Sequence, residues 1–462
     1  MNILSMVELL HLIKGEESTL AFHPQTYSIL DLPQQVYKVL SLYQKGISIG
    51  QIALTTGYKE GEILNLLENL NHCLESIHIP KVSNCFHDKR HIYRITLHIS
   101  NDCNLRCRYC YATGGNYNQK RELMSYSTAD SFIDFCRFHF DQIENIVFFG
   151  GEPLLNIKII DYVCNSFESL YEKGKINKMP SFGIITNGTI MNSSILKILI
   201  KHIKFITISI DGPEKINDAN RVFPDGKGSY EKIISFINTI RKNSNISIKY
   251  EATYTDINIR NNITHTDLHK FFNSIGLEGI ITDDINIKGS SSIQKVSEEL
   301  KFSELELPEG FWSILSSIVY KEPKQMCQII KKTFAVSTTG NIYACHMDNG
   351  IEEANMGNIF GKNIFNSPEE YIRKHPLIPL LDNKEKTCGG CWAINICAGC
   401  TRKWFFNKKN SRYEVIPNKG LCIQNREHIE RIILLISKIR KDKNLWEEFL
   451  NFVNQKKQQF HE

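Results

Sequence analysis

The sequence predicts an α/β protein built around an open, partial (β/α)6 barrel, with a small winged-helix module before it and a cysteine-rich domain after it. The barrel is predicted by apolar, strand-like segments that alternate with helix-length stretches between about residues 91 and 320. The cysteine-rich domain is predicted by seven cysteines that follow residue 321, where regular periodicity fades and bound metal is needed to hold the chain together. The expected domains are residues 1–88, 89–318 and 319–440, with a helical tail at 441–462.

Residues 1–88 show two strand-like pieces and then three helical segments, an order that suits a small winged helix. These pieces are Leu20–Phe22, Tyr27–Leu32, Pro33–Lys45, Ile49–Thr56 and Lys59–Cys73. The last two helices also resemble a helix–turn–helix, so a DNA-binding regulator is an alternative. The second of them carries Glu60, Glu62 and Glu68 against Lys59 alone. Because phosphate backbones need basic residues, this charge pattern disfavours DNA as a partner.

Five apolar segments are expected to form barrel strands, with helix-length stretches between them. They are Tyr93–Ser100, Asn145–Phe149, Phe182–Thr186, Phe205–Ile210 and Ile248–Tyr254. The chain closes with an amphipathic, lysine-rich helix from about Asn425, broken near residues 441–444.

Charge and length exclude some classes of function. The net charge is +5, from 55 basic and 50 acidic residues, which is too even to indicate a nucleic-acid or membrane partner. No basic residue precedes the first apolar stretch, so we expect a cytoplasmic protein without a signal or an anchor. In such a chain, 14 cysteines favour metal or cluster ligation over disulfides.

The first cysteine group follows the first expected barrel strand. Cys103, Cys107 and Cys110, the cluster-loop cysteines, form a CxxxCxxC spacing that brings three thiolates to one face of a cubane and leaves its fourth iron without a protein ligand. A zinc knuckle is the alternative, but zinc needs four ligands and no histidine lies close behind. The spacing therefore predicts an iron–sulfur cluster with an open iron.

The segment CNLRCRYCYA that contains these cysteines resembles the radical S-adenosylmethionine (SAM) superfamily. The resemblance implies that the open iron binds the amino and carboxyl groups of SAM, with the aromatic residue Tyr109 beside the cofactor. It also implies that the reduced cluster splits SAM into methionine and a 5′-deoxyadenosyl radical. An external donor such as flavodoxin or ferredoxin would supply the electron.

Further residues stand where the family places its SAM contacts. Gly150, Gly151 and Glu152 follow the apolar strand IVFF and resemble the family's GGEP motif, which meets the SAM amino group. Arg221 resembles an arginine that meets the SAM carboxylate. Its alternative is a solvent-facing arginine beside Asp218. The other expected cofactor contacts, at carboxyl ends of strands, are Asn187, Ser209 and Asp211.

The later cysteines resemble the seven-cysteine pattern of SPASM domains, which carry auxiliary [4Fe–4S] clusters. By that pattern one cluster would be held by Cys388, Cys391, Cys397 and Cys422, and the second by Cys327, Cys345 and Cys400. The second cluster would lack a fourth cysteine, so its last iron is open or bound by another group. Only two residues separate Cys397 from Cys400, where the family usually has three. A zinc site at Cys388, Cys391, Cys397 and Cys400 is the alternative.

The N-terminal module resembles the PqqD-like elements that bind leader peptides by adding a strand to a small sheet. Recognition module, barrel and SPASM domain in this order are the layout of peptide maturases, so we expect a precursor peptide with a leader as substrate. The preferred prediction is a thioether cross-link, with carbon–carbon or carbon–oxygen cross-linking equally compatible with the motifs. An anaerobic sulfatase maturase is the other alternative, but those enzymes carry an aspartate where His346 follows Cys345 here.

Overall fold

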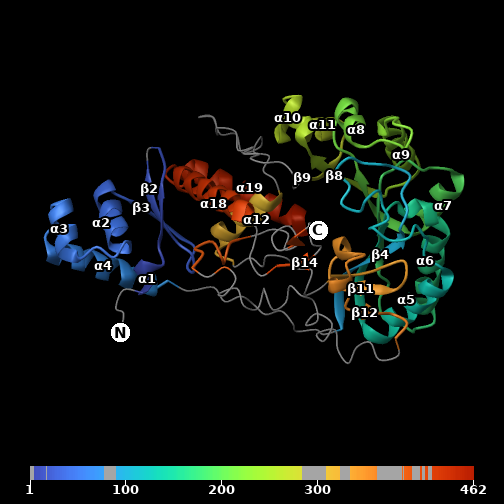
Figure 1. The fold of residues 1–462 in the computed structure, drawn as a ribbon, viewed down its shortest axis with the longest axis horizontal. Helices are drawn as coiled ribbons and strands as arrows, with labels where there is room; N and C mark the ends of the chain where they lie inside the picture. Colours follow the sequence, from blue (N-terminus) through green and yellow to red (C-terminus); the bar gives the residue numbers. More distant parts are fainter. Residues whose placement is uncertain are drawn as a thin grey trace.

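The computed structural model describes residues 5–16, 18–77, 90–283, 309–322, 333–361, 388, 390–397, 406–407, 412–414 and 419–461. Within them, the largest sheet has the strand order β12-β11-β10-β4-β5-β6-β7-β8-β9. Its strands β4 to β9 follow one another in the chain and each runs parallel to the next. The predicted α/β fold with a mainly parallel central sheet is therefore confirmed (Figure 1).

Five of the six parallel strands coincide closely with the five expected apolar segments, and the sixth, β9, was not predicted. They are β4 (His91–Ser100), β5 (Gln142–Gly150), β6 (Ser181–Thr186), β7 (Ile203–Ser209), β8 (Ser247–Tyr254) and β9 (Glu278–Asp283). Their inner residues, such as Ile95, Phe148 and Ile206, are fully buried. Strands buried on both faces explain the near-continuous apolar runs of the sequence.

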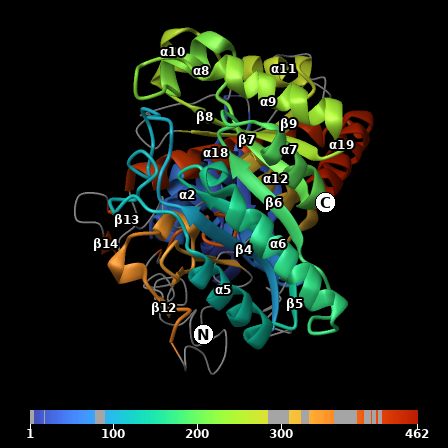
Figure 2. The ribbon, with the colours of Figure 1, turned by 90° about the vertical axis from the view of Figure 1, so that its right-hand side faces the viewer.

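Helices follow the strands and cover the outer face of the sheet, as the view from the barrel side shows for α5, α6 and α7 (Figure 2). They are α5 (Tyr126–His139), η1 (Pro153–Asn156), α6 (Ile157–Glu172), α7 (Ser193–His202), α8 (Glu214–Asn220), α9 (Tyr230–Asn243), α10 (Asp256–Arg260) and α11 (His265–Ser274). Ser125 and Asn192 begin α5 and α7 by accepting bonds from backbone N–H groups of the first turn. Phe132, Phe167 and Phe236 lie fully buried in the core beneath.

Three strands from beyond the barrel extend its sheet. β10 (Thr333–Val336) runs parallel to β4, and β11 (Asn341–Tyr343) and β12 (Gly357–Asn358) continue antiparallel. Two short 3-10 helices, η3 (His346–Asp348) and η4 (Glu352–Ala354), lie between β11 and β12. The first described strands after β9 thus belong to the barrel's own sheet, and Cys345 follows β11, which is separated from β4 by β10.

The N-terminal part contains an antiparallel sheet in the order β1-β2-β3 with helices packed on it. Its elements are α1 (Ser5–Glu8), β1 (His11–Lys14), β2 (Thr19–His23), β3 (Ser28–Leu32), α2 (Gln34–Gln44), α3 (Ile49–Thr56) and α4 (Glu60–Glu75). The two strands and three helices expected here are present within two residues of their predicted ends, and β1 was not predicted. Ala21 packs on the helices of this part, whereas its neighbours Leu20 and Phe22 face the other way.

That second face packs on helices that follow the barrel strands in the chain (Figure 1). These helices are α12 (Glu309–Tyr320), α18 (Lys419–Ile439) and α19 (Lys443–His461). A small hairpin of β13 (Phe406–Asn407) and β14 (Arg412–Tyr413) precedes α18 in the chain. Leu20, Phe22, Leu315 and Ile433 are fully buried in this shared core. None of the helices in the described part of the chain is long and apolar enough to cross a membrane.

Candidate active site

The cluster-loop cysteines lie in the loop that follows β4. Backbone bonds hold this loop against the segment after α8: the N–H of Arg106 donates to Val222 at 2.7 Å and that of Arg108 to Asn220 at 3.0 Å. Burial, followed by the charge of Glu152 and the Cys107 and Cys110 thiols, raises the pKa of Cys103 to about 12. The three thiols are therefore gathered in one half-buried place.

The donor set fits a cubane cluster better than a single ion. Among the residues that the structure describes, no three His, Cys, Asp or Glu side chains are arranged to hold one metal ion. The thiols are still close enough to raise one another's pKa. Ligand sulfurs of a cubane bind different irons and stand farther apart than the ligands of one ion, so these two observations agree with a [4Fe–4S] site.

Gly150 and Gly151 let the end of β5 pack directly on the backbone that enters the cluster loop. Gly150 has a φ of +137°, and a Cβ there would meet the Ser100 carbonyl oxygen at 2.2 Å. A Cβ on Gly151 would meet the Asp102 carbonyl oxygen at 2.2 Å. The N–H of Glu152 donates to that same Asp102 oxygen at 2.7 Å. Only glycine permits this approach, which fixes the loop against the sheet.

Glu152 joins the ends of β5 and β6 from a fully buried position. Its carboxylate accepts from Thr186 Oγ1 at 2.6 Å, from the N–H of Asn187 at 2.8 Å and from the N–H of Leu154 at 3.0 Å. Burial raises its pKa to about 6, against the opposing effect of these bonds. Glu152 is thus held by the chain itself, and it orders the backbone beside the cluster loop.

Asn187 connects β6 to the cluster loop. Its Nδ2 donates to Asn104 Oδ1 at 2.9 Å and to the Cys103 sulfur at 3.7 Å. The Cys103 sulfur also accepts from the N–H of Leu105 at 3.4 Å. Ser209 ends β7 opposite Glu251 of β8. The structure therefore brings Glu152 and Asn187 together with Cys103.

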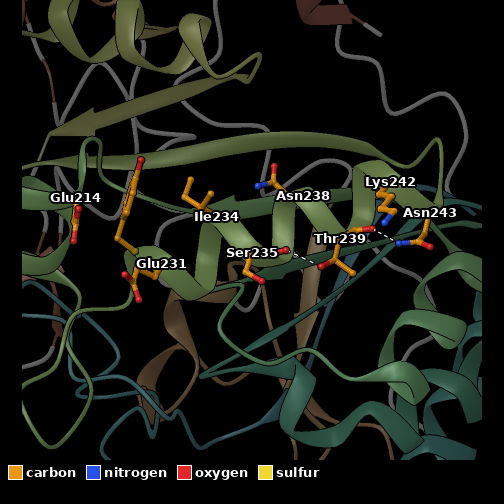
Figure 3. Close-up of a pocket in the computed structure, with 9 residues that line it drawn as sticks. Glu214, Glu231, Ile234, Ser235, Asn238, Thr239, Lys242 and Asn243 are labelled. Carbon is orange, nitrogen blue, oxygen red and sulfur yellow. Dashed lines mark hydrogen bonds between the residues drawn. The ribbon is translucent and has the colours of Figure 1, made fainter.

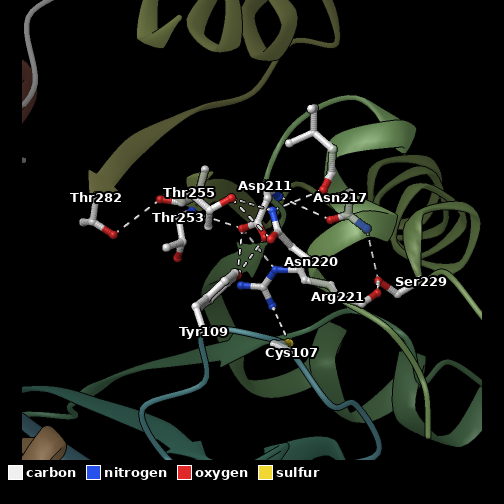
Figure 4. Close-up of polar contacts among 12 residues, drawn as sticks. Cys107, Tyr109, Asp211, Asn217, Asn220, Arg221, Ser229, Thr253, Thr255 and Thr282 are labelled. Carbon is white, nitrogen blue, oxygen red and sulfur yellow. Dashed lines mark hydrogen bonds and ion pairs between the residues drawn. The ribbon is translucent and has the colours of Figure 1, made fainter. Parts of the chain in front are cut away.

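Asp211, Arg221 and Tyr109 form a second group beside Cys107 (Figure 4). The Tyr109 hydroxyl lies 2.8 Å from each carboxylate oxygen of Asp211, and Arg221 Nε lies 3.2 Å from Asp211 Oδ1. The Arg221 side chain is only 10 % exposed. The alternative of a solvent-facing arginine beside Asp218 is wrong, because Arg221 turns inward to pair with Asp211.

The C-terminal cysteine set, Cys388, Cys391, Cys397 and Cys422, also gathers. Burial and then the thiols of Cys391, Cys388 and Cys422 raise the pKa of Cys397 to about 12. Asn425 Nδ2 donates to the Cys397 sulfur at 3.2 Å. Cys345 is buried at the end of β11. Cys327 and Cys400 lie outside the described residues, so the second auxiliary set and the zinc alternative stay predictions.

A polar group inside the barrel was missed by the sequence analysis. His98 of β4 is fully buried, and its Nδ1 lies 3.2 Å from Asn349 Nδ2. Burial and then the charge of His346 lower its pKa to about 3. The signal in the sequence was a histidine inside the apolar strand ITLHIS.

A surface groove along α9 is lined among others by Glu214, Ile234 and Lys242 (Figure 3). None of its lining residues is one of the predicted site residues. It therefore has no part in the site described above.

Fold and site together define an iron–sulfur enzyme of the α/β class. Residues 97–260 match the family model of the radical SAM superfamily. The chain is 30% identical over 278 residues to an uncharacterized protein of Methanocaldococcus jannaschii. This match covers 60% of this chain and 91% of that protein. The chain belongs to the radical SAM superfamily, and its cofactors are a [4Fe–4S] cluster and SAM.

Two further likenesses cover more of the chain. It is 23% identical over 465 residues to the radical SAM cyclopropyl synthase TigE of Paramaledivibacter caminithermalis, covering 91% of this chain and 93% of that enzyme. The solved structure of native anSMEcpe with bound AdoMet and Cp18Cys peptide matches with a TM-score of 0.56 at 18% identity, covering 78% of this chain and 99% of that one. The second likeness supports the fold.

Proposed function

We propose that this radical SAM enzyme is a peptide maturase, which installs a cross-link in a ribosomally made precursor peptide that carries a leader. The observation that carries the proposal is the contact between the N-terminal sheet and the loop of residues 391–397, which contains Cys391 and Cys397 of the C-terminal cysteine set. A strand added to an edge of that sheet is held at a fixed place relative to the C-terminal cysteine set.

This contact is specific. His11 of β1 stacks on Trp392 with ring centroids 3.8 Å apart and planes within 8°, and its Nε2 lies 2.8 Å from Glu430 Oε1. The Tyr27 hydroxyl donates to the Asn395 carbonyl oxygen at 3.2 Å. Trp392 and Asn395 lie between Cys391 and Cys397 in the chain. A leader bound at the sheet is therefore next to the loop that we propose binds an auxiliary cluster.

The likenesses support a peptide substrate. The match to TigE covers 91% of this chain. The anSMEcpe structure holds AdoMet and a peptide on the same fold. We infer that the peptide substrate of this chain enters the barrel from the side where its strands end, beside the cluster loop.

The residues of this chain have distinct tasks in the proposed reaction. When bound, the reduced cluster and SAM supply a 5′-deoxyadenosyl radical that abstracts a hydrogen atom from the peptide. The cluster-loop cysteines hold the cluster, and Glu152 with Asn187 keeps their loop in place. The C-terminal cysteine set and the group of Cys327, Cys345 and Cys400 would hold two auxiliary clusters. A flavodoxin or ferredoxin would supply the electron.

The bond that forms has three candidates. A thioether replaces a C–H and an S–H bond by one C–S bond, a carbon–carbon cross-link replaces two C–H bonds by one C–C bond, and a carbon–oxygen cross-link replaces a C–H and an O–H bond by one C–O bond. The sequence favours the thioether, whereas the likeness to a cyclopropyl synthase favours the carbon–carbon bond. Each reaction removes two hydrogen atoms from the peptide, but only the thioether consumes a thiol.

The test uses the full enzyme, anaerobically reconstituted, with SAM, a reductant and a synthetic candidate precursor peptide that carries its leader. We expect the peptide to lose two hydrogen atoms per cross-link, and a leaderless version of the peptide to react poorly. Alkylation with iodoacetamide then counts the thiols. One thiol lost per cross-link identifies a thioether, and unchanged thiols identify a carbon–carbon or carbon–oxygen bond. SAM cleavage with every tested precursor left intact would contradict a peptide maturase.

A further inference from the structure

We propose that Arg221 sets the reduction potential of the cluster held by the cluster-loop cysteines, by donating a charged hydrogen bond to the sulfur of Cys107. Asp211 holds the guanidinium group in the orientation that this requires. The inference concerns the cluster alone and does not depend on which substrate the enzyme modifies.

The guanidinium group spans the two partners. Its Nη1 lies 3.8 Å from the Cys107 sulfur, within the range of an N–H···S hydrogen bond, and its Nε lies 3.2 Å from Asp211 Oδ1 (Figure 4). Its carbon lies 5.5 Å from the centre of the Tyr109 ring. Arg221 follows α8, and the N–H of Arg221 donates to the Asn217 carbonyl oxygen at 2.7 Å, which fixes the backbone from which the side chain starts.

Asp211 is fully engaged by the protein. It is completely buried at the end of the β7 segment, and its oxygens accept from the Tyr109 hydroxyl and from the N–H of Thr253 at 3.1 Å, besides the ion pair with Arg221. Its own N–H donates to Asn217 Oδ1 at 3.3 Å. These contacts make Asp211 a positioning residue that anchors Arg221 and Tyr109. The contact of Asp211 with SAM stays a prediction.

The charge on Arg221 is retained although the side chain is buried. Arginine stays protonated in proteins, and the carboxylate of Asp211, whose Oδ1 lies 3.2 Å from Arg221 Nε, pairs with its charge. The residue is only 8 % exposed, so solvent and salt screen its charge weakly. Because Asp211 pairs with this charge, Arg221 acts on the cluster mainly through its N–H···S hydrogen bond to Cys107.

The effect on the cluster has a definite sign. Reduction adds negative charge to the cluster and its sulfur ligands, and hydrogen bonds to those sulfurs raise the potential. A positive donor at Cys107 therefore favours the reduced state, which is the state that cleaves SAM. Loss of this donor moves the potential to a more negative value.

The test is a redox titration of the reconstituted full-length protein in the absence of SAM, followed by electron paramagnetic resonance. The signal that changes when SAM is added identifies the relevant cluster. We expect R221Q to shift its midpoint potential to a more negative value. R221K keeps the charge but cannot span Asp211 and Cys107 together, so it shifts the potential less and in the same direction. The matched control is R108Q, which removes the same charge from the exposed residue next to Cys107 and leaves the potential near that of the parent.

SAM affinity, measured on the same samples, separates this role from a contact with the SAM carboxylate alone. A parent-like potential in R221Q, together with weakened SAM binding, overturns the proposal and returns Arg221 to the cofactor. If R221Q does not retain the cluster, R221K decides the question: a more negative potential supports the proposal, and an unchanged potential overturns it.

Discussion

The buried histidine of β4 makes protein stability depend on pH in a way that can be worked out. His98 is fully buried, with the rings of Tyr117 and Phe149 each 5.2 Å away. Burial and then the charge of His346 lower the pKa of His98 from 6.5 to about 3. The folded state therefore keeps this residue neutral at pH values where the unfolded chain binds a proton.

The sign and size follow from proton linkage. Because the folded-state pKa is lowered, stability is fully present above the unfolded pKa and is lost as the pH falls from there towards the folded pKa. Each pH unit between the two values costs about 1.4 kcal/mol. At pH 5, about 1.5 units below the unfolded value, His98 alone lowers the free energy of unfolding by about 2 kcal/mol. At pH 7 its contribution is close to zero.

The perturbation is His98→Gln, which keeps a polar group of similar length and does not titrate. Urea unfolding of the iron-free protein, followed by far-ultraviolet circular dichroism, gives the free energies of parent and variant at pH 7 and pH 5. We expect the difference between them to move by about 2 kcal/mol in favour of the variant at pH 5. The control is His72→Gln on the exposed face of α4. A difference that is the same at both pH values would show that His98 titrates normally in the folded protein and would refute the reasoning.

Replacing all three cluster-loop cysteines by alanine should abolish the formation of 5′-deoxyadenosine from SAM while the auxiliary iron remains, as high-performance liquid chromatography and iron analysis of one sample can check. Protein purified without oxygen should carry iron and not zinc at the C-terminal cysteine set, and one zinc per chain by elemental analysis would contradict this. Phe22→Ala should lower the free energy of unfolding by about 3–5 kcal/mol, because this fully buried ring lies in the shared core. Leu54→Ala, at a side chain that is 89% exposed, should change it by less than about 0.5 kcal/mol in the same urea titration.

The shared core also changes how the N-terminal part can be studied. Removal of residues 1–88 would uncover Ile433 and its neighbours on α18, which Leu20 and Phe22 cover in the intact chain. Exposed apolar faces of this kind promote aggregation. Point substitutions at the sheet edge, in the full-length chain, are therefore the better way to test leader binding.

Local patterns in the sequence determined most of the elements and the identity of the cluster loop. Strand-like apolar runs predicted five of the six parallel strands, because strands buried on both faces carry few polar residues. The spacing of the cluster-loop cysteines needs only a short loop, so it is visible without tertiary structure. The glycines at positions 150 and 151 were likewise visible as a motif.

Only the tertiary structure decided which distant side chains meet. The pairing of β10 with β4 joins residues more than 230 positions apart, and no local signal encodes such a register. The turn of Arg221 away from solvent depends on Asp211 at the end of another strand and on Cys107 in the cluster loop. β2 and α18 share one core because their apolar faces are complementary. In the sequence, each of the two shows only the pattern of an ordinary amphipathic element. Periodicity in the sequence indicates that a face is buried, but only the folded chain shows which residues that face packs against.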